Sequence, residues 1–416
     1  MNKRNIIKTI AVLFIAIFCV MCMGACGNKG ENSVKEEIKE KEFYLQASPT
    51  SLLCHESNTA FSNGFIYYGK DNKLYEYDTI EGKLAVIDPK LEANTWLSCY
   101  SLYDGYIFAV KRVYSTADNS ESYSIVKVDY NTGDVTEIYV PDDKLDIIGC
   151  MTVSKDGKLY FSQGHFVSGD KDEDGYNNDF YIYSYDIGSG ECNRIVCGNT
   201  YYIADGKIYF TRLNADSDTE RLFYAELSSA NQVTDMGIDV ATMVSAGGQY
   251  VYYPTDGKVY YSARDNKLMC YDMEKKDSSV VCTFCDDSYV RFFQYWNDKM
   301  IVLLREPRNG KSGYHYGLYY IDETGEPVKV LDDSDFNKDY LYDFEAIDYM
   351  IVFNDCDEYF LLSNYDPSDE RRVYLVDKDF KLTEAITIGD WDYKAYEEEQ
   401  KEIERIMSAG QNGGQQ

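Results

Sequence analysis

Histidine and tryptophan are scarce in this sequence, and each occurs three times among 416 residues. Structural zinc sites take their ligands from closely spaced histidine and cysteine pairs. The chain offers one Cys-x-x-C pair, formed by Cys282 and Cys285, and a strand would point these two side chains to opposite faces. A zinc site of this kind is therefore not expected.

Positive charge is scarce as well. The 71 acidic side chains outnumber the 41 basic ones and give a formal net charge of −30. A surface of this charge repels phosphate backbones, so no nucleic-acid partner is expected. Cysteine is present 12 times, but Cys19, Cys22 and Cys26 lie near the N-terminus and leave an odd, scattered set. Such a set does not predict a disulfide framework.

Tyrosine is abundant, with 41 residues, and it lies in short runs bounded by turn signals. Residues 72–84 read NKLYEYDTIEGKL, a turn, a Tyr-rich run and a second turn. The five-residue frame LYEYD returns about every 50 residues, a period typical of solenoids, propellers and arrays. Its later copies end at Asp129, Asp186, Glu226, Asp272, Asp322 and Asp377.

Each repeat predicts four antiparallel strands, because a second strand precedes the LYEYD strand and a fourth follows a tight turn after it. Apolar residues on both faces of the LYEYD strand indicate sheets stacked face to face, as in a β-propeller. We therefore expect an all-β fold, a propeller of four-stranded antiparallel blades over residues 43–390. Seven blades fit best; six or eight remain open, because residues 254–267 suggest an extra hairpin. Either residues 43–47 or residues 380–388 close the last blade.

The motif G-x-[IL]-[YF]-[YF] followed by LYxYDxxTG resembles the uncharacterised bacterial propellers that are compared with the YWTD propeller of LDL-receptor-related proteins. The resemblance covers nearly the whole chain after residue 42, although IYYGK (66–70) and IYFTR (208–212) stand where YWTD would be. It implies a propeller on a surface lipoprotein of a Gram-positive bacterium, and it brings no catalytic residue.

The first 26 residues predict export. Lys3, Arg4 and Lys8 precede an apolar run of about 14 residues, which is typical of a secretory signal. The run ends in Met-Gly-Ala-Cys, which resembles the bacterial lipobox with Met23 in place of leucine; the alternative is an ordinary cleaved signal. We expect residues 1–25 to be removed, Cys26 to carry a lipid, and residues 27–42 to act as a tether. The protein would then be anchored to the outer face of the cytoplasmic membrane. Residues 391–416 predict an amphipathic helix and a disordered tail.

The loops between the second and third strands of the repeats are long and varied, whereas the other turns are tight. Long loops on a rigid scaffold tend to carry binding sites. The candidate ligand- or partner-binding residues on this face are His165, Tyr176, Arg212, Arg305, Tyr314, His315, Tyr316 and Tyr365.

The segment DKDEDG (170–175) matches the start of a calcium loop, with carboxylates at Asp170, Asp172 and Asp174. Tyr181 stands where the closing glutamate is expected, so an acidic hairpin tip is the alternative. No other cofactor is expected.

No motif of a propeller enzyme is visible. Sialidase-type Asp boxes, the tryptophan repeats of quinone-cofactor propellers, and the G-x-S-x-G motif of prolyl-oligopeptidase-type enzymes are all missing from the sequence. The sequence therefore favours a non-enzymatic binding module for a protein partner in the cell envelope. A receptor for an oligosaccharide or peptide at the long-loop face is the first alternative, and a propeller enzyme acting on a glycan or peptide is the second.

Overall fold

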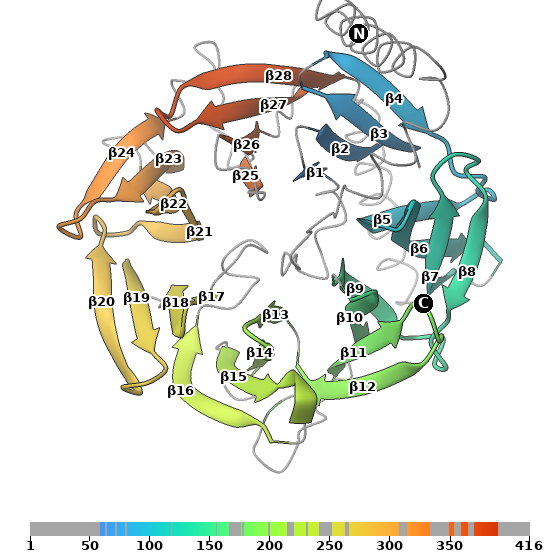
Figure 1. Cartoon of the computed structure of the whole chain (residues 1–416), viewed down its shortest axis with the longest axis horizontal. Coiled ribbons are helices and arrows are strands. Elements are labelled where there is room, and N and C mark those ends of the chain that lie inside the picture. Colours follow the sequence, from blue (N-terminus) through green and yellow to red (C-terminus); the bar gives the residue numbers. More distant parts are fainter. Residues whose placement is uncertain are drawn as a thin grey trace, which may run out of the picture.

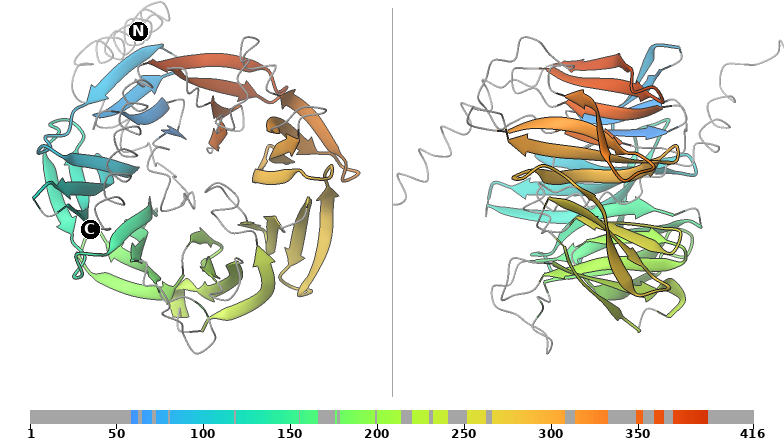
Figure 2. Two further views of the ribbon diagram at one scale, coloured as in Figure 1. Left: turned by 180° about the vertical axis from the view of Figure 1, so that it is seen from behind. Right: turned by 90° about the vertical axis from the view of Figure 1, so that its left-hand side faces the viewer.

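A computed structural model describes residues 59–62, 65–70, 73–79, 81–117, 119–154, 156–165, 176, 179–198, 200–213, 220–229, 232–240, 252–262, 266–307, 314–332, 349–352, 359–364 and 370–389. In this part of the chain the strands form seven four-stranded antiparallel sheets, each made of consecutive strands. Figure 1 shows the sheets placed around a common centre, and Figure 2 shows them from behind and edge-on.

The strands of the first four sheets are β1 (Thr59–Ser62), β2 (Phe65–Lys70), β3 (Lys73–Asp78) and β4 (Lys83–Ile87); β5 (Thr95–Tyr103), β6 (Tyr106–Ser115), β7 (Ser120–Asp129) and β8 (Val135–Tyr139); β9 (Ile147–Val153), β10 (Lys158–Gly164), β11 (Phe180–Asp186) and β12 (Cys192–Cys197); and β13 (Tyr201–Ala204), β14 (Lys207–Leu213), β15 (Glu220–Glu226) and β16 (Thr234–Val240). Those of the last three are β17 (Tyr252–Thr255), β18 (Lys258–Ser262), β19 (Lys267–Asp272) and β20 (Asp277–Thr283); β21 (Tyr289–Trp296), β22 (Lys299–Pro307), β23 (Tyr314–Ile321) and β24 (Pro327–Asp332); and β25 (Tyr349–Val352), β26 (Tyr359–Asn364), β27 (Glu370–Asp377) and β28 (Leu382–Gly389). A single short 3-10 helix, η1 (Leu227–Ser229), occurs among the described residues, where no helix has the length and apolar character needed to span a membrane.

The acidic residue that ends the LYEYD frame holds the turn after the third strand of its sheet. Asp186 Oδ1 accepts a hydrogen bond from the backbone amide of Ser189 at 2.8 Å. Asp322 Oδ1 accepts from the amides of Thr324 and Glu326 at 2.8 and 2.9 Å. Such side-chain caps are the physical reason why aspartate recurs at turns. The same carboxylate-to-amide bonds occur at Asp78, Asp129, Asp272 and Asp377. In the fourth sheet the residue is Glu226, and η1 follows it in place of the turn.

The hydrophobic cores lie between successive sheets. In β19, Leu268 and Cys270 belong to the core shared with the sixth sheet, whereas Met269 and Tyr271 pack against the core shared with the fourth. The third strand is thus covered on both faces, as the sequence predicts. Full burial of one large apolar side chain contributes about 1.5–3 kcal/mol to stability.

The all-β prediction with four-stranded antiparallel sheets is confirmed. Inner strands of several neighbouring sheets contact each other: β5 contacts β9, and β17 contacts both β13 and β21. In addition, β1 of the first sheet contacts β25 of the last. The sequence predicted an additional hairpin at 254–267. In the structure this segment is part of the fifth sheet itself, because β17 and β18 are the first two strands of that sheet. The seventh sheet takes its fourth strand from β28, so residues 380–388 supply it. Residues 43–47 and the helix expected within 391–416 lie outside the described residues.

Candidate functional site

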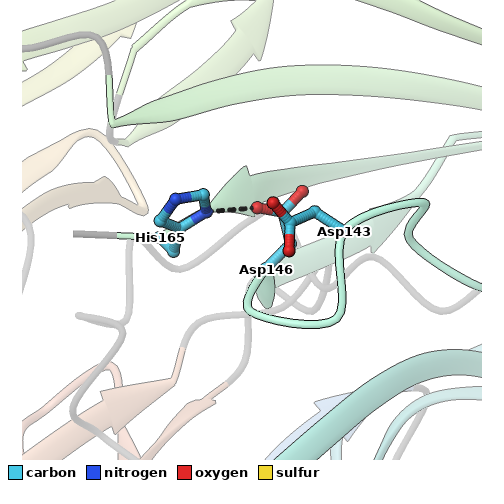
Figure 3. Close-up of side chains that lie close together, drawn as sticks. All are labelled: Asp143, Asp146 and His165. Atoms are coloured by element: carbon cyan, nitrogen blue, oxygen red, sulfur yellow. Dashed lines mark hydrogen bonds and ion pairs between the residues drawn. The ribbon is translucent and has the colours of Figure 1, made fainter. Parts of the chain in front are cut away.

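One histidine and two aspartates come together at the edge of the third sheet from which the connection between β10 and β11 starts. This edge, and the equivalent edge of the other sheets, is called the long-loop edge. Ile147, the first residue of β9, pairs with Gly164, the last residue of β10. The residues just beyond this pair are Asp146 and His165, so the strand register itself places them side by side. Asp143 lies in the same connection as Asp146, between β8 and β9. Figure 3 shows its carboxylate beside the Asp146 carboxylate and close to the His165 ring.

The three side chains are close enough to share one ligand. His165 Nδ1 lies 2.7 Å from Asp146 Oδ1, as the dashed line in Figure 3 marks. Taking one ligand atom from each of Asp143, Asp146 and His165, all three atoms lie within 4.8 Å of one another. Asp143 is exposed, and the other two side chains are partly exposed, so solvent reaches the cluster.

The buried side-chain amide of Gln163 orients the Asp146 carboxylate. Gln163 Nε2 donates to Asp146 Oδ2 at 2.7 Å, and the Gln163 side chain is 5% exposed. Its carbonyl Oε1 in turn accepts a hydrogen bond from the Tyr139 hydroxyl at 2.5 Å. Tyr139 and Gln163 therefore fix the Asp146 carboxylate in one orientation.

Carboxylates dominate the electrostatics around His165. Its hydrogen bond to Asp146 raises the imidazole pKa above its ordinary value, and the charges of Asp146, Asp143 and Asp179 raise it further, against a smaller opposing effect of desolvation. Asp179 is held close because Gly164 has no side chain: a Cβ there would lie 1.9 Å from the Asp179 carbonyl oxygen. An imidazole bonded to a carboxylate can accept a proton at its other nitrogen, and this set of donors can also bind a cation.

Two further candidate residues meet at the fourth sheet. The Arg212 guanidinium carbon of β14 lies 4.9 Å from the centre of the Tyr176 ring and 5.5 Å from that of Phe223. The Tyr176 and Phe223 rings pack edge to face, with centroids 5.4 Å apart. Burial lowers the pKa of Arg212. Arg212 and Tyr176 are separate candidates in the sequence, and the fold places them in one cation–π contact.

The sixth sheet contains four candidates, on β22 and β23. Arg305 pairs with Tyr316, and Tyr314 pairs with Pro307. Tyr316 is 9% exposed and packs in the core between the sixth and seventh sheets. His315 Nε2 lies 3.4 Å from Glu306 Oε2.

Glu306 is the centre of a polar network that the sequence analysis did not select. It is 7% exposed, and it accepts hydrogen bonds from Lys329 Nζ and the Tyr319 hydroxyl, both at 2.6 Å. Burial raises the pKa of Glu306, but the hydrogen bonds from Lys329 and Tyr319 outweigh it and hold the pKa below its usual value.

Several expected site residues cannot be compared with the structure. Asp170, Asp172 and Asp174 of the predicted calcium loop lie outside the described residues, as do Tyr365 and Cys26. His165 was predicted from the sequence as a site residue, whereas Asp143, Asp146 and Gln163 were not. Asp143 and Asp146 could have been found from the segment PDDKLD (141–146). This segment directly precedes β9, and the strand that pairs with β9 ends next to His165.

Comparisons with known proteins give the chain structural neighbours but no matching family. No family model matches the chain, and no curated protein matches it. Among solved structures it is similar to a post-proline cleaving enzyme from Rickettsia typhi, with a TM-score of 0.51 and 9% identity over 88% of this chain and 57% of that one. It is also similar to dipeptidyl peptidase 4 from Porphyromonas gingivalis, with a TM-score of 0.48 and 10% identity over 87% and 62% of the two chains. An acylaminoacyl peptidase from Pyrococcus horikoshii follows with a TM-score of 0.46 and 13% identity over 77% and 50%. The chain thus spans less than two thirds of each of these proteins. At 9% identity, the likeness to the post-proline cleaving enzyme shows the β-propeller type of fold alone.

These neighbours correct three expectations from the sequence. The resemblance to the YWTD propeller of LDL-receptor-related proteins is wrong, because the structural neighbour with a TM-score of 0.51 is a post-proline cleaving enzyme. The expectations of a non-enzyme and of a pure binding module for an envelope protein or an oligosaccharide are corrected by the same comparison, since this neighbour is an enzyme. The LYxYD frame encodes a strand and an aspartate-held turn. That combination suits any four-stranded antiparallel sheet, so it does not distinguish one propeller family from another.

Proposed function

We propose that this chain is a peptidase-type β-propeller, closed as a ring of seven blades, that acts in the cleavage of peptides. The observation that carries the proposal is the similarity to the post-proline cleaving enzyme, which extends over 88% of this chain at a TM-score of 0.51. The contact between β1 and β25 supports closure of the ring, since it joins the first sheet to the last.

The long-loop edge is the face that we assign to the peptide. It carries the His165–Asp146 pair in the third sheet and the Arg212–Tyr176 pair at the fourth. Carboxylates and an imidazole can bind the amide and ammonium groups of a peptide, and an arginine stacked on an aromatic ring can bind a carboxylate. The formal net charge of −30 favours peptides that carry positive charge, because the protein's field attracts them.

We also propose the location that the N-terminal sequence predicts. Residues 1–25 are removed on export, Cys26 carries a lipid, and residues 27–42 tether the propeller outside the cytoplasmic membrane. Peptides of the cell exterior are then its substrates.

Incubation with defined peptides tests the proposed cleavage. The purified chain is mixed with synthetic peptides that differ in net charge and in the presence of an internal proline, and the products are followed by mass spectrometry. We expect shortened products, formed faster from the basic peptides than from the acidic ones, and none with heat-inactivated protein. Peptides that all stay intact in the presence of protein shown to be folded by circular dichroism would overturn the proposal.

A further inference from the structure

The cluster at the edge of the third sheet has the composition of a metal site. It offers two carboxylates and one imidazole, each with an atom within 4.8 Å of the others. Calcium and magnesium prefer oxygen ligands, whereas zinc, manganese and related ions combine imidazole nitrogen with carboxylate oxygen. We propose that Asp143, Asp146 and His165 bind a divalent transition-metal ion, with zinc as the representative ion.

The present geometry is close to what such an ion requires. Bonds of about 2.0–2.2 Å from zinc to nitrogen and oxygen place two neighbouring ligand atoms roughly 3.0–3.5 Å apart. His165 Nδ1 and Asp146 Oδ1 are now 2.7 Å apart and share a hydrogen bond. A cation would replace the proton between them after a separation of only some tenths of an ångström. Asp143 is exposed and lies beside them, so it completes the set without disturbing the core.

Two residues outside the cluster, Gln163 and Tyr139, hold the Asp146 carboxylate by hydrogen bonds, as outer-shell residues do in metal sites. Gln163 is almost fully buried, yet its amide points outward at Asp146 Oδ2, and Tyr139 holds that amide in place. Hydrogen-bonded partners of this kind orient ligating carboxylates in metal sites. Both supporting residues belong to strands, β8 and β10, so the hydrogen bonds that orient the Asp146 carboxylate come from the sheet.

The surrounding charge also favours a cation. The charged groups that act on His165 come from two elements packed at this edge: Asp143 and Asp146 from the β8–β9 connection, and Asp179 from the residue before β11. All three are carboxylates, and a divalent ion would relieve their mutual repulsion. Three protein ligands leave coordination positions for water, as in zinc sites that are open to substrate.

Metal titration of the full chain tests this assignment without any peptide, so its outcome is separate from that of the proposed cleavage. The protein is freed of metal with a chelator and titrated calorimetrically with zinc chloride. We expect saturable binding of one ion, and an affinity at least tenfold lower in D143N and lower still in D146N and H165Q. H315Q is the matched control, since His315 lies in the sixth sheet, and its zinc affinity should equal that of the native chain.

Cobalt(II) separates this site from the thiols, because cysteine thiols can also bind zinc and that of Cys285 is exposed. Cobalt bound at the proposed site should show visible d–d absorption without a thiolate charge-transfer band. D143N provides the safest test, because Asp143 is exposed and its substitution leaves the buried Gln163 and the partly buried Tyr139 in place. Unchanged zinc affinity in both D143N and H165Q, or a thiolate band with cobalt, would contradict the assignment.

Discussion

Lys329 reaches across an intervening strand to Glu306, with its Nζ 2.6 Å from Oε2. Lys329 lies on β24 and Glu306 on β22, and β23 runs between them. Gly317 of β23 makes the contact feasible, because a Cβ at this position would lie 2.7 Å from Glu306 Oε2 and 3.1 Å from Lys329 Cε. Because Gly317 has no side chain, Lys329 and Glu306 can form an ion pair across β23.

The first prediction concerns this glycine. Gly317→Ala should displace the Glu306 carboxylate and destabilise the protein by about 1–3 kcal/mol, the usual cost of inserting a methyl group into a packed site. Urea unfolding at neutral pH measures the loss. Gly188→Ala is the control, because Gly188 is exposed and its Cβ would approach only Asp186 Oδ1, at 3.5 Å. That control should change stability by less than about 0.5 kcal/mol. Equal effects of the two substitutions would count against the role of Gly317.

The second prediction concerns the pH dependence of Glu306. Hydrogen bonds from Lys329 and Tyr319 lower its pKa in the folded state against the effect of burial. A carboxyl group with a lowered pKa stabilises the fold fully above its unfolded pKa, and the contribution disappears as the pH falls through the folded value. Glu306→Gln should therefore cost roughly 2 kcal/mol at pH 7, the size of a charge-assisted hydrogen bond. The difference from the native chain should shrink steadily below about pH 4.5. Urea unfolding over this pH range measures it, and a constant difference would refute the assignment.

The third prediction tests the aspartate-held turns. Asp186→Ala removes the acceptor of the Ser189 amide, whereas Asp186→Asn keeps an oxygen acceptor and loses the charge. Thermal unfolding midpoints at pH 7 should fall in the order native, Asn variant, Ala variant. The backbone hydrogen bond from Ser189 lowers the Asp186 pKa, so the advantage of the native chain over the Asn variant should be present at neutral pH and decline in acid. Glu226→Ala is a useful comparison, because η1 replaces the turn at that position.

The fourth prediction concerns Tyr139, a positioning residue for the proposed metal site. Tyr139→Phe removes the hydroxyl that holds Gln163 and leaves the ring in the core, where it packs on Phe161 at 5.1 Å. Zinc affinity should fall about tenfold, the lower range for loss of an outer-shell partner. The unfolding midpoint without metal should also fall, because the nearly buried Gln163 Oε1 loses its donor, so zinc is titrated at a temperature at which both proteins are folded. Equal zinc affinity of the variant and the native chain would show that Tyr139 does not position Asp146.

The fifth prediction concerns the N-terminus. Labelled palmitate fed to bacterial cells that express the chain should enter the native protein and not the Cys26→Ser variant. The variant should also appear in the soluble fraction. Labelling of both proteins to the same extent would rule out Cys26 as the lipid-bearing residue.

The sequence predicted the sheets because their determinants are local. The aspartates of the LYEYD frame sit at turns that each one holds by itself, so their recurrence marks the sheets along the chain. The fifth sheet differs from the prediction because residues 248–253 resemble a second strand, whereas Tyr252 and Tyr253 belong to β17, the first strand of that sheet. The family was misjudged because a strand followed by an aspartate-held turn is a general feature of such sheets.

The site was only partly predictable, because its geometry depends on pairing between distant segments. His165 stood out as a histidine in a long loop. Asp146 could be matched to it only through the pairing of Ile147 with Gly164, which the sequence does not show. The contact between Tyr176 and Arg212 likewise arises from the approach of two sheets.

The pairing of Ile147 with Gly164 has a consequence for protein engineering. His165 and Asp146 are attached directly to strand ends, so the register of β9 against β10 sets their mutual distance. A protein library that leaves these two strands unchanged keeps the two side chains in place. The third sheet therefore offers a fixed anchoring point, which makes this edge a suitable starting point for libraries of altered specificity.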